Sequence, residues 1–182
     1  ELWPVDGRGV ADLDWLADRL AAGGPALVAL AWANHETGVI QSVAEVAARV
    51  RAAGGWLHLD AVQAAGKLPI RWTEIEADTL SLSAHKLGGP VGVGALHVAR
   101  DLRPMPLSHG GGQERDIRSG TLDAAGAVGL ALALEHAVEH RAAESARLAA
   151  LRDRVLSGAL ALDLGIEVTG CWEPGDTTTR LA

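Results

Sequence analysis

The stretch DTLSLSAHKLGGPVGVGALHVA, residues 78–99, contains two apolar runs separated by a short glycine-rich segment. Residues 78–83 and 91–99 have the length and apolar character of β-strands. The connection between them, Lys-Leu-Gly-Gly-Pro, is too short to contain a crossover helix. We therefore expect the second strand to run antiparallel to the first, or to pair elsewhere.

Residues upstream of this stretch alternate between helical and strand patterns. Helices are expected over 10–22 and 42–53, and strands over 26–32 and 56–60. Ser42 is expected to cap the second helix, with Glu45 completing a capping box. Strand, helix and strand in succession predict right-handed crossovers. The fold class is therefore α/β, with a mostly parallel sheet and helices on both faces.

The downstream part of the chain is rich in Ala, Leu, Glu and Arg. Residues 122–162 predict two helices or one long bent helix, and residues 165–170 (GIEVTG) predict a strand that opens a new unit. We place a domain boundary near residues 140–145. Residues 1–141 would then form part of a large domain, and residues 142–182 the beginning of an incomplete small domain.

Charge and composition exclude several classes of function. With 16 basic and 23 acidic residues, the formal net charge is −7, which disfavours non-specific binding to nucleic acid. No apolar run approaches the roughly 20 residues of a membrane span, and the first ten residues lack the features of a signal peptide. A single cysteine, Cys171, fits a reducing compartment, so a cytoplasmic location is expected. Because the chain starts at Glu1 without a methionine, we expect a piece of a longer protein.

Polar residues follow three of the expected strands at the point where each ends. In open α/β sheets, ligands bind at the carboxyl ends of the strands. Taken singly, each residue has an ordinary structural explanation; Asp60, for example, is a favoured helix cap, and Lys86 would be a surface charge. Together they indicate a binding site. The residues are Asn34, His35, Asp60, Gln63, Ser83, His85 and Lys86.

This set of functional groups is suited to pyridoxal 5′-phosphate. The chain has only two lysines, Lys67 and Lys86, among 16 basic residues. A lysine amine forms a Schiff base with an aldehyde, which arginine cannot do. A carboxylate such as Asp60 would hold the proton on the pyridine nitrogen, while hydroxyl and imidazole groups would bind the phosphate and an amide would bind the ring hydroxyl. Lys67 is the competing Schiff-base residue, but GKLPIRW resembles a helix exit away from the strand ends.

Four blocks carry a resemblance to a known family. They are ANHETGVIQ (33–41), HLDAVQAAGK (58–67), SLSAHKLGGPVGVGAL (81–96) and GGGQERDIRSGTL (110–122). In this order and spacing they resemble cysteine desulfurases of the NifS/IscS type, in the class V aminotransferase group. The resemblance implies the large domain of fold type I pyridoxal-phosphate enzymes.

The resemblance also implies a role for each matching residue. Lys86 would be the Schiff-base lysine, and Asp60 would pair with the pyridine nitrogen. Gln63 and Asn34 would bind the ring hydroxyl, and Ser83 and His85 the phosphate. Thr121 would reach the phosphate of a neighbouring subunit, which implies a homodimer; on residues alone, an N-cap for a helix starting at Leu122 is equally open.

Several parts of the family's active site have no match in this chain. The resemblance puts the sulfur-accepting cysteine well beyond residue 182, so Cys171 is not expected to be the nucleophile. It puts a ring-stacking histidine and a phosphate-binding threonine before Glu1, and a substrate-binding arginine downstream. This chain alone is therefore expected to be inactive.

The leading hypothesis is a fragment of a cysteine desulfurase. Such an enzyme would convert L-cysteine to L-alanine and pass sulfur as a persulfide to an acceptor or scaffold protein for iron–sulfur cluster assembly or thiolation. A selenocysteine lyase or another class V aminotransferase would share the same residues. A non-catalytic α/β paralogue acting as a dimerising or docking module is the alternative of a different class. His136 and His140 share a helix face but have no third ligand nearby, so no metal site is expected.

Overall fold

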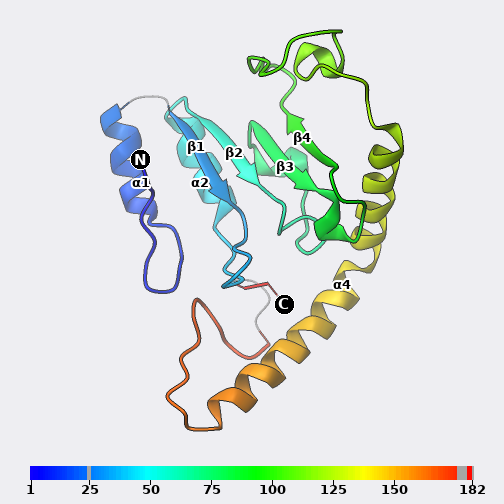
Figure 1. The fold of residues 1–182 in the computed structure, drawn as a ribbon. Helices are drawn as coiled ribbons and strands as arrows, with labels where there is room; N and C mark the ends of the chain where they lie inside the picture. Colours follow the sequence, from blue (N-terminus) through cyan, green and yellow to red (C-terminus); the bar gives the residue numbers. More distant parts are fainter. Residues whose placement is uncertain (24–25, 176–179, 182) are drawn as a thin grey trace.

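The computed structural model describes residues 1–23, 26–175 and 180–181, with the secondary structure drawn in Figure 1. The strands are β1 (Leu27–Ala31), β2 (Trp56–Asp60), β3 (Thr79–Ser83) and β4 (Gly94–Val98). The α-helices are α1 (Leu13–Gly23), α2 (Val43–Ala52), α3 (Trp72–Ile75) and α4 (Ala124–Leu160). Two 3₁₀ turns are η1 (Ala84–Leu87) and η2 (Glu114–Asp116).

The four strands form one sheet in the order β1-β2-β3-β4. The pairs β1–β2 and β2–β3 are parallel, whereas β3–β4 is antiparallel, with Ser83 opposite Gly94. The predicted mostly parallel sheet is confirmed, and so is the antiparallel direction of its last strand. In the two parallel pairs, Ala31 lies beside Asp60, which lies beside Ser81, so β1, β2 and β3 end at the same edge.

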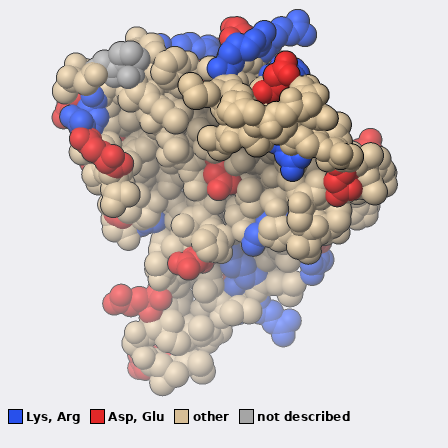
Figure 2. Space-filling view, turned by 45° about the horizontal axis from the view of Figure 1, so that its top comes forward, with Lys and Arg blue, Asp and Glu red and all other residues tan. Residues whose placement is uncertain are grey.

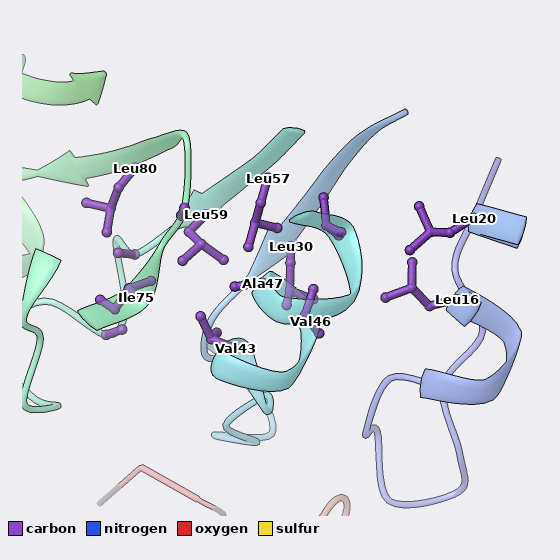
Figure 3. Packing of buried hydrophobic residues seen from close by; sticks show 14 residues of the cluster. Leu16, Leu20, Leu30, Val43, Val46, Ala47, Leu57, Leu59, Ile75 and Leu80 are labelled. Carbon is purple, nitrogen blue, oxygen red and sulfur yellow. The ribbon is translucent and has the colours of Figure 1, made fainter. Parts of the chain in front are cut away.

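The hydrophobic core lies between the sheet and the helices α1 and α2 (Figure 3). Leu57 and Leu59 alternate with outward-facing residues on β2 and are almost completely buried. Val46 of α2 packs between these strand residues and Leu16 of α1. Burial of each such side chain contributes about 1.5–3 kcal/mol of transfer free energy. This core fixes the positions of the strand ends.

Helix α2 starts after Ser42 as predicted, but its predicted capping box and the predicted start of α4 differ from the structure. Ser42 is the N-cap of α2 but makes no side-chain capping hydrogen bond, and Glu45 instead accepts a 2.7 Å hydrogen bond from Arg49. The predicted capping box is therefore wrong, because the i,i+4 arginine takes the glutamate. Helix α4 begins at Ala124 rather than Leu122, and its N-cap is Asp123, whose Oδ1 accepts from the backbone N–H of Gly126. The alternative role of Thr121 as an N-cap is thereby contradicted.

The region after residue 122 is one continuous helix followed by an irregular segment. Helix α4 has 37 residues and runs without interruption through residues 140–145. The predicted strand at 165–170 is wrong, because no strand is assigned there. Gly165 and Gly170, at the two ends of this segment, have φ of +66° and +84°, which turns the chain out of extended geometry.

Asp153 ties the C-terminal segment to α4. Its carboxylate accepts hydrogen bonds from the Trp172 indole Nε1 (2.9 Å) and from the backbone N–H of Gly175, and it pairs with Arg152. The hydrogen bond from Trp172, followed by that from Gly175, lowers the pKa of Asp153 to about 2. The ionised carboxylate therefore favours attachment of this segment to the helix.

Acid is expected to weaken this attachment progressively as the pH falls from 3.8, the ordinary pKa of an aspartate, to about 2. Because the pKa of Asp153 is depressed in the folded protein, its stabilising effect is complete above the unfolded value and is lost as the pH falls through about 2. At pH 3, Asp153 should still be about nine-tenths ionised. A ¹³C titration of the full-length protein measures this directly, and Trp172→Phe should raise the midpoint. A wild-type midpoint near 3.8, the ordinary value, would contradict the assignment.

Candidate functional site

The candidate site lies at the carboxyl ends of β2 and β3. Asp60 is the last residue of β2, and Ser83 is the last residue of β3. The 3₁₀ turn η1 follows directly and carries His85 and Lys86. Because the two strands are adjacent and parallel, these groups come from one edge of the sheet.

Ser83 and His85 form a hydrogen-bonded pair. Ser83 Oγ lies 2.7 Å from His85 Nδ1, and the direction of the bond depends on the imidazole tautomer. The Ser83 side chain is partly exposed, and His85 is exposed. A hydroxyl and an imidazole side by side offer polar hydrogens to a bound anion.

Asp60 acts in part as a local cap. Its Oδ1 accepts a 2.9 Å hydrogen bond from the backbone N–H of Val62, at the start of the turn formed by residues 61–67. Its second oxygen, Oδ2, has no hydrogen-bond partner within the described residues. The carboxylate therefore combines the capping role considered from the sequence with an oxygen open to a ligand.

Lys86 is exposed on a firmly held turn. Ala84, two residues before Lys86, is fully buried. Its backbone N–H donates to the Val93 carbonyl, and its own carbonyl accepts from the backbone N–H of Gly89. Gly88 closes η1 with φ of +82°, a conformation that favours glycine. The Nζ of Lys86 has no hydrogen bond or ion pair to any residue that the structure describes. Within the described residues, this amine has no competing partner.

Lys67 is closer to the candidate site than the sequence indicated. Its Nζ donates to Gln63 Oε1 at 3.0 Å and to the Gln63 backbone carbonyl at 3.2 Å. Burial lowers the pKa of Lys67, and the positive charge of Lys86 lowers it further. The prediction that Lys67 lies away from the strand ends is therefore wrong. The i,i+4 spacing from Gln63 was the available signal.

Asn34 and Thr121 are less directly placed. Asn34 follows β1 at the same edge, but its side-chain oxygen accepts the backbone N–H groups of Glu36 and Thr37 and so closes its own loop. Thr121 is exposed in the segment between β4 and α4. Because β4 is antiparallel, the chain leaves the sheet at the end opposite the candidate site (Figure 1). Within the described residues, no hydrogen bond or ion pair joins Thr121 to the other candidate residues.

Several of the other histidines make contacts within the fold. His58 Nδ1 lies 2.9 Å from Thr79 Oγ1, the His97 ring meets Trp72 edge-on, and His140 Nδ1 bonds the His136 carbonyl. His35 is exposed, 3.9 Å from the Glu36 carboxylate. Within residues 1–23, 26–175 and 180–181, no group of three His, Cys, Asp or Glu side chains is arranged to hold a metal ion.

Cys171 is partly exposed, and its Sγ contacts the Arg8 carbonyl at 3.8 Å. The neighbouring Arg180 guanidinium donates to the Cys171 carbonyl. In the part of the chain that the structure covers, no helix is both long and apolar enough to cross a membrane.

Two cavities lie away from the candidate residues. One, of about 190 Å³, lies at the amino end of β2 between Gly55 and Asp78, and another, of about 270 Å³, is lined by Arg100, Arg103 and Arg115 with two neighbours. Basic and acidic side chains are interspersed on the face shown in Figure 2. At the candidate site, Asp60, His85 and Lys86 are exposed at the edge of the sheet.

Known proteins similar to this chain are cysteine desulfurases. A cysteine desulfurase of Gluconacetobacter diazotrophicus is 44% identical over 177 residues, or 97% of this chain and 43% of the relative. An IscS-like cysteine desulfurase of Mycobacterium tuberculosis is 50% identical over 75% of this chain and 35% of its own length. Cysteine desulfurase NifS of Azotobacter vinelandii is 42% identical over 92% of this chain and 41% of its own length. The chain thus spans less than half the length of these relatives.

Solved structures show the same fold. A NifS-like protein superposes with a TM-score of 0.84 at 40% identity, covering 90% of this chain and 45% of its own. A NifS-like protein from Rickettsia africae superposes with a TM-score of 0.86 at 28% identity, covering 98% and 49%. These likenesses confirm the fold type I architecture expected from the sequence. Residues 1–177 match the family described as aminotransferase class-V, and the chain belongs to that family.

Proposed function

We propose that the full-length protein containing this chain is a pyridoxal-phosphate-dependent cysteine desulfurase. It would convert L-cysteine to L-alanine and pass sulfur as a persulfide to an acceptor protein. The observation that carries the proposal is the convergence of Asp60, Ser83, His85 and Lys86 at the ends of two adjacent parallel strands. The names of the relatives support the desulfurase reaction.

The chemistry of these groups fits the cofactor. The open oxygen of Asp60 suits a protonated pyridine nitrogen, and the Ser83–His85 pair suits a phosphate. The exposed amine of Lys86 suits an aldehyde. Gln63, one turn after Asp60, and Asn34, at the end of β1, supply amides for the ring hydroxyl. When bound, pyridoxal phosphate supplies an electron sink for the substrate α-carbon.

The residues of this chain would then bind, orient and move a proton. Lys86 would attach the cofactor through Nζ and, once substrate displaces it, take the proton from the substrate α-carbon as general base. Asp60 would keep the proton on the pyridine nitrogen by its negative charge. Ser83 and His85 would hold the phosphate and so fix the distance between Lys86 and the α-carbon.

We further propose a homodimer with two sites. Thr121 is exposed in the long segment between β4 and α4, and this segment leaves the sheet at the end opposite the candidate site. A second copy of the chain would supply the threonine to the phosphate. We also propose that residues 1–141 belong to the cofactor-binding domain and 142–182 to the start of the small domain. A cytoplasmic location, with sulfur directed to iron–sulfur clusters or thiolation, completes the proposal.

An assay of the full-length protein with L-cysteine tests the reaction. We expect alanine and, with a thiol reductant present, sulfide in equal amounts, only after loading with pyridoxal phosphate. If the protein turned over L-selenocysteine but not L-cysteine, it would be a selenocysteine lyase and not a cysteine desulfurase. Amino-group transfer to a keto acid without release of sulfur would indicate another class V aminotransferase. A protein that binds no cofactor would favour the non-catalytic module.

A further inference from the structure

We propose that Lys67 is a positioning residue that sets the direction of the Gln63 amide at the cofactor site. The inference rests on the proposed function, in which Gln63 binds the ring hydroxyl of pyridoxal phosphate. Its basis is the 3.0 Å hydrogen bond from Lys67 Nζ to Gln63 Oε1.

The hydrogen bond determines which end of the amide is presented. A lysine ammonium only donates hydrogen bonds, and an amide accepts only through its oxygen. Gln63 therefore turns Oε1 toward Lys67 and directs its NH₂ group elsewhere. An ionised ring hydroxyl is an acceptor and needs an N–H donor. Without Lys67, the amide is free to rotate and to present an oxygen that would repel the ring oxygen.

The turn that carries both residues is held against η1 and α4. Lys67 is half-buried, and Ser145 of α4 donates to the Lys67 backbone carbonyl at 3.4 Å. Gly66, between the two side chains in sequence, has φ of +69°, and a Cβ there would lie 2.7 Å from Ala137 Cβ and 2.9 Å from Leu87 Cδ2. Close packing therefore fixes this backbone, so Nζ has a restricted reach.

Lys67 also neighbours the amine that would attach the cofactor. Burial lowers the pKa of Lys67, and repulsion from the positive charge of Lys86 lowers it further. The second hydrogen bond, from Nζ to the Gln63 carbonyl, keeps the Lys67 ammonium on the side of Gln63. Lys67 thus acts through Gln63, whereas Lys86 is left for the cofactor.

A double-mutant cycle on the full-length protein tests the proposal. Lys67→Met should weaken the binding of pyridoxal phosphate by about tenfold, the effect expected for one charge-assisted hydrogen bond. Lys67→Arg should restore most of this binding. In the Gln63→Ala background, Lys67→Met should cost less than about twofold further, because the residue through which it acts is gone. Ser145→Ala, which touches the same backbone without removing Nζ, is the matched control.

A second measurement needs no cofactor. In the unloaded protein with ¹⁵N-labelled glutamine, Lys67→Met should shift the side-chain amide signal of Gln63, whereas Ser145→Ala should leave it in place. An unchanged Gln63 signal would overturn the proposal. It would also be overturned if Lys67→Met weakened cofactor binding equally in the wild-type and Gln63→Ala backgrounds, because Lys67 would then act by its charge and not through Gln63. If the wild-type protein bound no cofactor, the proposed function would fail, and the amide signal would still decide whether Lys67 orients Gln63.

Discussion

Lys86→Ala is expected to abolish covalent attachment of pyridoxal phosphate. The wild-type full-length protein should show a visible chromophore that borohydride reduction fixes to Lys86, and the variant should show neither. Turnover of cysteine should fall by about 10³-fold or more, because the variant loses both the attaching amine and the general base. Absorbance spectra and peptide mapping after reduction measure the first effect, and alanine formation the second.

Two lysine variants serve as controls for this result. Lys86→Arg keeps the charge but should fail as completely as alanine, because a guanidinium does not form the required bond. Lys67→Met should bind the cofactor more weakly but still carry the reduced label on Lys86. Since Lys86 is exposed, none of the variants at this position should unfold the protein. Label on Lys67, or a chromophore that survives in Lys86→Ala, would show that the lysine was assigned wrongly.

Asp60→Asn should lower turnover by about 10²–10³-fold, in the range seen when one preorganised electrostatic contact is removed. The substitution is informative because the amide oxygen of asparagine can still accept the backbone N–H of Val62. Asparagine caps turns about as well as aspartate does, so the local structure should survive. The loss would therefore report the negative charge alone.

The comparison of Asp60→Asn with Asp60→Ala separates the two roles of this carboxylate. Alanine removes both the charge and the cap, so it should also lower the melting temperature, whereas asparagine should not. Turnover and the cofactor's absorbance spectrum follow the first role, and thermal unfolding follows the second. If Asp60→Asn turned over cysteine at the wild-type rate, Asp60 would be a cap and nothing more.

Local pattern was enough to predict the elements that place the site. The runs at 26–32, 56–60 and 78–83 each contain a strand, as expected for segments too short for a typical helix that bury apolar side chains against α1 and α2. The short connection before β4 predicted its antiparallel direction. The polar residues after each strand met at one edge, since parallel neighbours end together.

The sequence did not show which of several possible hydrogen-bond partners a side chain would choose. Glu45 matched a capping box, yet Arg49, one turn further on, takes its carboxylate. Residues 165–170 have apolar character, but glycines with positive φ turn the chain at both ends. In each case a local rule was satisfied, and a neighbouring group or a backbone turn decided otherwise.

By itself, the sequence determined the four strands of the sheet and the order of the polar residues that follow them. These depend on residue type and spacing within short segments. Only the tertiary structure decided that Lys67, in the turn after β2, lies within electrostatic reach of Lys86, in the turn after β3. These two turns meet only after β2 and β3 have paired and α4 has packed against η1, so the proximity of the two lysines has no local signature in the chain.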